Sequence, residues 1–181
     1  MRNLITISSL LVLSIATVTL PACGQEDKTA RPSPPAHASC SLPSGKTITV
    51  DYSSPRMRGR KIYGGLVPYG QVWRLGANEA TTFVNTGDLT VMGKDVPAGS
   101  YTLFAVPDQT RWTLIISKKT AEWGIPYPGE GYELARVEMT SAKLPSPAEA
   151  FTISFDQTSG ACTMNVDWET TRASETFTEK K

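Results

Sequence analysis

Histidine and cysteine are scarce in this 181-residue sequence, which contains one histidine and three cysteines. Hydrolysis by a serine or cysteine nucleophile usually needs a histidine base beside the nucleophile. A zinc site needs a cluster of cysteine and histidine ligands. The only histidine, His37, lies in a proline-rich stretch without a second ligand beside it, which suggests linker composition. We therefore expect no metal site, no cofactor and none of the common nucleophilic hydrolase sites.

An excess of charge of either sign is also missing. The sequence has 18 basic and 17 acidic residues, which gives a formal net charge of +1. Proteins that bind nucleic acid or an anionic membrane surface usually carry a basic patch. The balanced composition therefore gives no reason to expect nucleic acid as a partner.

Long apolar runs are limited to the N-terminus, where Leu4 to Leu20 follows the short positive segment Met1-Arg2-Asn3. This arrangement is typical of a signal peptide. The small Ala22 before Cys23, and Leu20 three residues before it, have the spacing of a bacterial lipoprotein processing site. We predict that residues 1–22 are removed and that Cys23 is acylated, because two or more acyl chains anchor a protein stably. The alternatives are an ordinary secretory peptide cleaved nearby and an uncleaved anchor of marginal length.

The residues after Cys23 bear on the location of the protein. No aspartate follows the cysteine directly, which by resemblance to enterobacterial sorting rules favours the outer membrane, facing the periplasm. The pair Glu26-Asp27 resembles an acidic surface-export tag, so exposure on the cell surface stays open. The expected partner is thus a membrane, reached through the lipid anchor, and the oligomeric state is not predicted.

Two cysteines, Cys40 and Cys162, remain once Cys23 is assigned to the anchor. In an oxidising compartment they are predicted to form a disulfide. A bridge across this separation stabilises the folded state by roughly 4 to 5 kcal/mol in the chain-entropy model. The alternative is a pair of free thiols, with Cys162 as a small core residue.

Composition divides the mature chain into a tether, a domain and a tail. Residues 23–39 are polar and then proline-rich, so we expect a flexible tether that holds the domain off the bilayer. Residues 40–175 form the single folded domain, and residues 176–181 form a tail.

Short alternating runs in residues 40–175 predict an all-β fold, and no segment shows sustained helical periodicity. Two neighbouring runs, Tyr101 to Val106 and Trp112 to Ile116, are apolar on both faces and predict a central hairpin. About eight strands at this spacing indicate a single β-sandwich, jelly-roll-like or immunoglobulin-like. The other predicted strands are Ile48 to Tyr52, Ala80 to Val84, Leu89 to Met92, Glu133 to Met139, Phe151 to Asp156 and Cys162 to Glu169.

Four sequence blocks carry a resemblance to a known family. They are GRKIYGGLVPYGQVWRLGANEATTF (Gly59 to Phe83), PAGSYTLFAVP (Pro97 to Pro107), WTLIISKKTAEWG (Trp112 to Gly124) and DWETTR (Asp167 to Arg172). Together they resemble the bacterial family called domain of unknown function 2911, over about Tyr52 to Arg172. The resemblance implies an exported, mostly β domain and assigns no activity. Leu75 stands where that family often has threonine, which argues against a required hydroxyl there.

The segment from Arg58 to Glu79 is predicted to be one long loop that carries several aromatic and charged residues, as binding loops do. A second, proline-stiffened loop contains Trp123 and Tyr127, which could stack on a ligand or pin the loop to the body. The alternative for the first loop is structural, with Trp73 as a core plug and Arg74 paired with Glu79. The candidate ligand-binding residues are Arg58, Tyr69, Trp73, Arg74, Asn78, Glu79, Trp123 and Tyr127.

Two functions of different classes follow from these residues. The first is a cell-envelope lipoprotein whose β-domain binds a glycan or another small ligand, or supports envelope architecture, without enzymatic activity. The second is an acid/base hydrolase that uses Glu79 with another carboxylate, which requires the two groups to face each other across about 5 to 10 Å.

Overall fold

The computed structural model describes residues 27–180, and within this part of the chain the fold is all-β. The only helical elements among these residues are two single 3-10 turns, η1 (Lys28–Ala30) and η2 (Glu130–Tyr132). Nine strands make up the rest of the regular structure. They are β1 (Pro35–Ser41), β2 (Thr47–Ser53), β3 (Thr81–Asn85), β4 (Leu89–Val91), β5 (Lys94–Val96), β6 (Gly99–Val106), β7 (Trp112–Ser117), β8 (Glu133–Thr158) and β9 (Ala161–Glu179).

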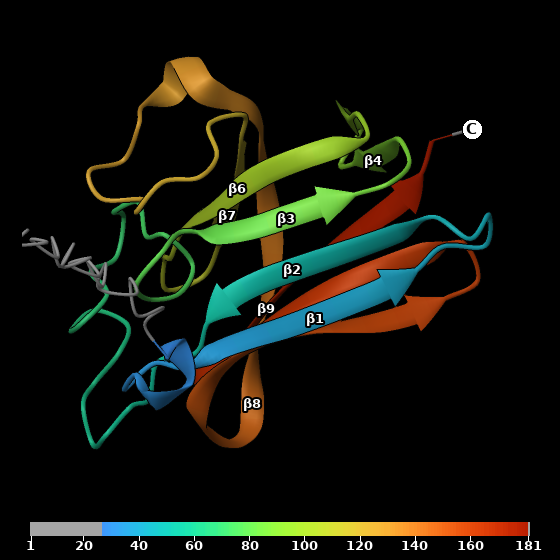
Figure 1. The fold of residues 1–181 in the computed structure, drawn as a ribbon. Helices are drawn as coiled ribbons and strands as arrows, with labels where there is room; N and C mark the ends of the chain where they lie inside the picture. Colours follow the sequence, from blue (N-terminus) through green and yellow to red (C-terminus); the bar gives the residue numbers. More distant parts are fainter. Residues whose placement is uncertain (1–26, 181) are drawn as a thin grey trace, which may run out of the picture.

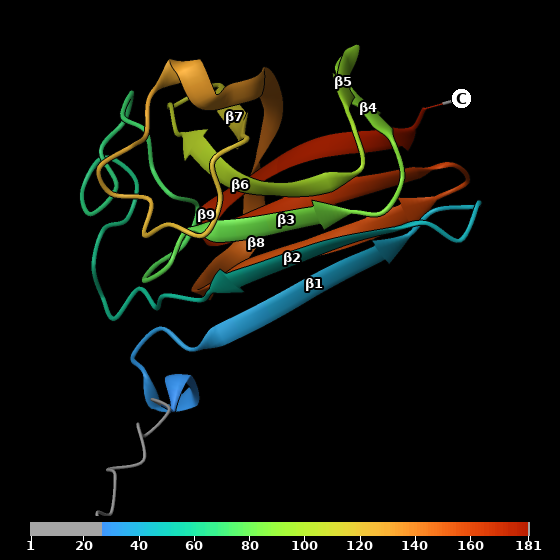
Figure 2. The same ribbon diagram turned by 45° about the horizontal axis from the view of Figure 1, so that its top comes forward.

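All nine strands belong to one antiparallel sheet with the order β1-β2-β3-β6-β7-β8-β9-β4-β5. The sheet folds over on itself, so that β8 and β9 lie behind β1, β2 and β3 (Figures 1 and 2). The long strand β8 makes this possible because its first part pairs with β7, while its later part pairs with β9. The result is a sandwich-like arrangement of two layers built from a single sheet.

Apolar contacts and polar bridges between the layers form the core. The rings of Phe83 in β3 and Phe177 in β9 lie 5.2 Å apart, centroid to centroid. The hydroxyl of Tyr52 accepts a hydrogen bond of 3.0 Å from the backbone N–H of Ile153 in the other layer. The predicted central hairpin is confirmed, since β6 and β7 pair and are buried along most of their length.

The predicted disulfide is also confirmed. Cys40 in β1 is bonded to Cys162 in β9, with their Cα atoms 6.2 Å apart. Both residues are buried, at 5% and 0% exposed. The bridge joins the two layers at the end of the sheet where β1 and β2 meet in a short turn and β8 and β9 meet in another.

The strand count differs from the expected eight in two ways. The predicted strands Glu133 to Met139 and Phe151 to Asp156 are parts of one bent strand, β8, whose pairing shifts between them. The short strand β5 and the edge strand β1 were not predicted. Strand β9 also continues to Glu179, through the part of the chain assigned to a tail.

Strand β1 begins at Pro35, inside the segment expected to be a flexible tether. It pairs with β2 along its whole length and buries Ala38 and Cys40 on its inner face. His37, interpreted above as linker composition, lies in this strand and contacts Asp51, with Nδ1 2.7 Å from the carboxylate. Side-chain alternation does not predict this strand, because it contains proline and several small residues. An edge strand tolerates such residues, whereas a central strand does not. The predicted signal peptide and Cys23 lie outside the described residues.

Candidate functional site

The long predicted loop is present as an irregular segment, residues 54–80, between β2 and β3. It lies at one end of the molecule, together with residues 118–129 between β7 and η2 and with residues 28–34 before β1 (Figures 1 and 2). We call these three segments the loop end. The last strand, β9, ends at the opposite end of the molecule (Figures 1 and 2).

Trp73 holds the middle of the first segment against the sheet. Its backbone N–H donates to the carbonyl of Ala105 in β6 at 2.7 Å, and the N–H of Ala105 donates back to the Trp73 carbonyl at 2.8 Å. The indole stacks on Trp168 of β9, with centroids 5.9 Å apart and an interplanar angle of 21°. Its edges contact Phe151 and Tyr63. Trp73 therefore has the structural role considered above, since it fills the end of the sandwich.

The segment is also tied down by Glu169, which follows Trp168 in β9. Its carboxylate accepts hydrogen bonds from the backbone N–H groups of Ile62, at 3.2 Å, and Tyr63, at 3.5 Å. Two of the sequence blocks described above, around Tyr63 and around Trp168, thus meet in space. Glycine permits another close approach, because a Cβ added to Gly124 lies only 2.9 Å from the Cβ of Ala80.

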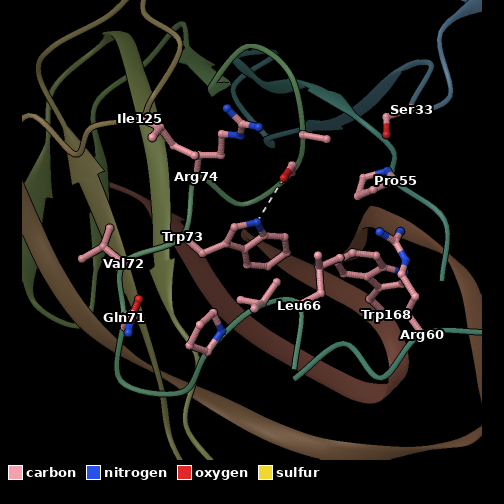
Figure 3. Close-up of a pocket in the computed structure, with 14 residues that line it drawn as sticks. Ser33, Pro55, Arg60, Leu66, Gln71, Val72, Trp73, Arg74, Ile125 and Trp168 are labelled. Atoms are coloured by element: carbon pink, nitrogen blue, oxygen red, sulfur yellow. Dashed lines mark hydrogen bonds between the residues drawn. The ribbon is translucent and has the colours of Figure 1, made fainter. Parts of the chain in front are cut away.

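A cavity of about 430 Å³ opens beside Trp73. A cavity of this size is large enough for a small ligand. Figure 3 shows Trp73 at its centre, with Arg74 and Ile125 on one side and Pro55, Arg60 and Trp168 on the other. The residues that line it include two arginines and no acidic residue. They are Ser33, Pro55, Arg60, Leu66, Val67, Pro68, Gln71, Val72, Trp73, Arg74, Gly76, Ala77, Ile125 and Trp168.

Neither arginine of the cavity forms an ion pair with a described acidic residue, although the charge of Glu79 acts on Arg74 through space and opposes the effect of burial on its pKa. Arg60 donates to the backbone carbonyls of Met57, at 2.9 Å, and Arg56, at 2.7 Å. Arg74 donates to the carbonyl of Trp123 at 3.3 Å, and its guanidinium lies 5.4 Å from the centroid of the Trp123 ring. Partial burial lowers the pKa of Arg74, which remains fully charged at neutral pH. Both guanidinium groups are therefore available to bind an anion.

Glu79 does not pair with Arg74, contrary to the structural alternative predicted from sequence. Its carboxylate accepts from Arg31 at 2.9 and 3.0 Å and from Lys28 at 2.9 Å. Hydrogen bonds lower the pKa of Glu79 to about 2, and the hydrogen bond from Lys28 has the largest effect. The prediction failed because Arg31 and Lys28 were assigned to a tether, whereas they fold back onto this loop.

The remaining candidates are mostly structural. Asn78 donates to the carbonyl of Ser33 at 3.0 Å and so joins the N-terminal segment to the loop. The backbone N–H of Arg58 donates to the carboxylate of Glu149 at 2.8 Å. Tyr69 is 37% exposed and does not line the cavity. Tyr127 donates to Glu133, and burial together with that carboxylate raises the pKa of the phenol. Its ring packs edge-on against Phe104, so it pins the second loop to the body.

Of the eight candidates, only Trp73 and Arg74 line the cavity, and Trp123, which is 52% exposed, contacts Arg74. Sequence reasoning missed Arg60, Leu66, Ile125 and Trp168. Arg60 and Leu66 stand in the block that was singled out, and Trp168 stands in the DWETTR block. Ile125 stands one residue beyond the block that ends at Gly124. Membership in a block was the only sequence signal for the other three, because the cavity forms where four distant segments meet.

The geometry does not favour the hydrolase alternative. Glu79 shares a shallow hollow with Glu122, but two cations hold its carboxylate in the ionised form. A general acid needs a raised pKa, and that of Glu79 is lowered to about 2. No three histidine, cysteine, aspartate or glutamate side chains of residues 27–180 are grouped to hold a metal ion. Within the same residues, no helix has the length and apolar character needed to cross a membrane.

Comparison with known proteins gives a family and no activity. No curated protein and no solved structure is detectably similar to the chain. The model of the family described as "Protein of unknown function (DUF2911)" matches residues 33–177. The matched range begins at Ser33, so it includes β1 as well as both loops and most of β9. Because the match covers most of the sequence, the chain belongs to the DUF2911 family of proteins of unknown function.

Proposed function

We propose that this protein is a binding module of the bacterial cell envelope, and that the cavity beside Trp73 binds a small ring-bearing carboxylate. One observation carries the proposal: two guanidinium groups that form no ion pair with a described acidic residue line a largely apolar cavity of about 430 Å³. Arginine binds carboxylates through paired, charge-assisted hydrogen bonds. The apolar walls suit the body of a ring, as in other ligand sites.

Two sources could supply such a ligand. An acidic sugar would combine the glycan suggested by the sequence with the arginines of the cavity, and an aromatic acid would use the same contacts. The shared chemistry is a carboxylate on a ring. Neutral sugars lack the group that Arg60 and Arg74 would bind.

The binding test uses the full mature protein and compares acidic sugars, aromatic carboxylates and neutral sugars by calorimetry. Arg74→Gln should weaken binding of the carboxylate about tenfold or more, because a hydrogen bond to a charged group contributes about 1.5 to 3 kcal/mol. Arg111→Gln is the matched control, since Arg111 is exposed and pairs with Glu138 away from the cavity. Equal binding of neutral and acidic sugars, or no binding by any of the three classes, contradicts the proposal.

We also propose that acylated Cys23 anchors this domain to the outer membrane, facing the periplasm. The support is the lipoprotein-like N-terminus together with the Cys40–Cys162 disulfide, which is typical of exported proteins. Cys23→Ser should move the protein from the membrane to the soluble fraction or leave it unprocessed. Unchanged processing with unchanged membrane retention excludes the anchor.

A further inference from the structure

Exposed apolar side chains gather at the loop end. Six large apolar side chains among residues 27–180 are exposed, and four of them lie in residues 54–80 and 118–129. The four are Leu66 (48% exposed), Tyr69 (37%), Trp123 (52%) and Ile125 (64%). Leu66 and Ile125 line the same cavity, so the two segments present their apolar tips side by side. Apolar residues gathered in this way usually mark an interaction surface.

The same surface is basic, although the whole chain is close to neutral. Residues 54–80 contain five basic residues and one acidic residue, Glu79. That carboxylate is occupied by Lys28 and Arg31. The exposed residues Arg58, Arg60 and Lys61 have no ion pair to a described acidic residue. Trp, Tyr and aliphatic tips beside lysine and arginine are the composition found at membrane interfaces. Although the net charge of the whole chain is close to zero, this surface is therefore basic and suited to bind anionic lipid.

The N-terminal segment reaches this end of the molecule. Lys28 and Arg31 bind Glu79, and the carbonyl of Ser33 accepts from Asn78. Cys23 precedes Asp27, the first described residue, by only four positions. Four extended residues span at most about 14 Å. An acylated Cys23 would therefore hold the loop end close to the bilayer, because residues 28–39, expected to be a spacer, pack on the domain instead.

We infer that the loop end docks on the bilayer surface. Leu66, Tyr69, Trp123 and Ile125 enter the boundary between headgroups and acyl chains, while Arg58 and Lys61 face lipid phosphates. The cavity beside Trp73 then opens at the membrane interface, since Leu66 and Ile125 form part of its lining. This inference rests on the anchor proposed at Cys23.

The test reconstitutes the full mature, lipidated protein in vesicles of phosphatidylethanolamine and phosphatidylglycerol that contain brominated acyl chains. Bromine quenches tryptophan fluorescence at short range. Of the four tryptophans, Trp123 is the most exposed, Trp73 is partly buried, and Trp112 and Trp168 are buried at 1% exposed. We expect brominated lipid to quench the wild type, and Trp123→Phe to lose most of that quenching. Leu66→Asp with Ile125→Asp should lower the quenching of Trp123 as well, since charge opposes entry into the acyl region.

A second tryptophan position supplies the control. Met92 is 67% exposed and lies in the turn between β4 and β5, away from the loop end (Figure 2). Met92→Trp in the Trp123→Phe background should escape quenching. Mass spectrometry of the same sample separates the two hypotheses. An unacylated Cys23 overturns both the anchor and the docking, whereas an acylated protein with unquenched Trp123, or with Met92→Trp quenched equally, overturns the docking alone.

Discussion

The sheet and the loop end are built on different principles. In the sheet, nearly every inward side chain is apolar and buried, and a disulfide crosses between the layers. At the loop end, backbone bridges, hydrogen bonds to the carboxylates of Glu169 and Glu79, and a hydrogen bond from the amide of Asn78 position segments that have little regular structure. The sheet therefore depends on burial and covalent linkage, while the loop end depends on individual polar contacts. Such an arrangement lets the loop end expose apolar and basic side chains to solvent, whereas the sheet buries its apolar side chains.

The largest effect is expected from removing the disulfide. Replacing both cysteines, Cys40→Ser with Cys162→Ser, should lower the free energy of unfolding by about 3 to 5 kcal/mol, because the bridge closes a loop of 122 residues. Denaturant unfolding of the mature protein measures this change. Hydrogen exchange should rise first in β1 and β9, and wild type treated with reductant should behave like the double variant. Equal denaturant midpoints for the oxidised and reduced wild type would show that the disulfide does not stabilise the packing of the two layers.

A smaller change in the free energy of unfolding, an increase instead of a decrease, is expected when Glu175 inside the sheet is replaced. This carboxyl lies on the inward side of β9 between Ala173 and Phe177, and burial raises its pKa above 4.5. Burial of the ionised form is unfavourable, so the contribution of Glu175 to stability is most favourable below pH 4.5 and is lost as pH rises through the raised folded-state pKa. Glu175→Gln should therefore stabilise the protein at pH 7 by on the order of 1 kcal/mol.

Thermal unfolding across the pH range measures the Glu175 effect. The difference between variant and wild type should shrink as pH falls below 4.5, since the wild-type carboxyl is then neutral in both states. Glu138→Gln, in an exposed side chain of β8, is the control and should show no comparable gain at pH 7. A variant of Glu175 less stable than wild type at pH 7 contradicts the idea that this charge is unfavourably buried.

The smallest effect is expected from Glu79→Gln at the loop end. The pKa of Glu79 is lowered to about 2, so its contribution is present above pH 4.5 and is lost as pH falls through about 2. Its side chain is 39% exposed, and exposed ion pairs contribute less than about 1 kcal/mol. Global stability should therefore change little, but hydrogen exchange of residues 28–34 at pH 7 should accelerate.

The control for Glu79 is Asp95→Asn, which removes an exposed ion pair with Lys180 in the sheet. This change should leave the exchange of residues 28–34 untouched. If Glu79→Gln also leaves it untouched, the ion pairs with Lys28 and Arg31 do not hold the N-terminal segment on the loop.

The sequence by itself determined the class of the fold, most of its strands, the disulfide and the position of the long loop. The fold class, the strands and the loop follow from local information, because side-chain alternation defines a strand and glycine and proline interrupt it. The disulfide follows instead from the number of cysteines and the expected oxidising compartment. The tertiary structure alone decided that Pro35 to Ser41 is a strand, that Glu79 binds Lys28 and Arg31, and that Arg60, Leu66, Ile125 and Trp168 line one cavity. Each of these depends on segments distant in sequence coming together in space, and residue order carries no direct record of such contacts.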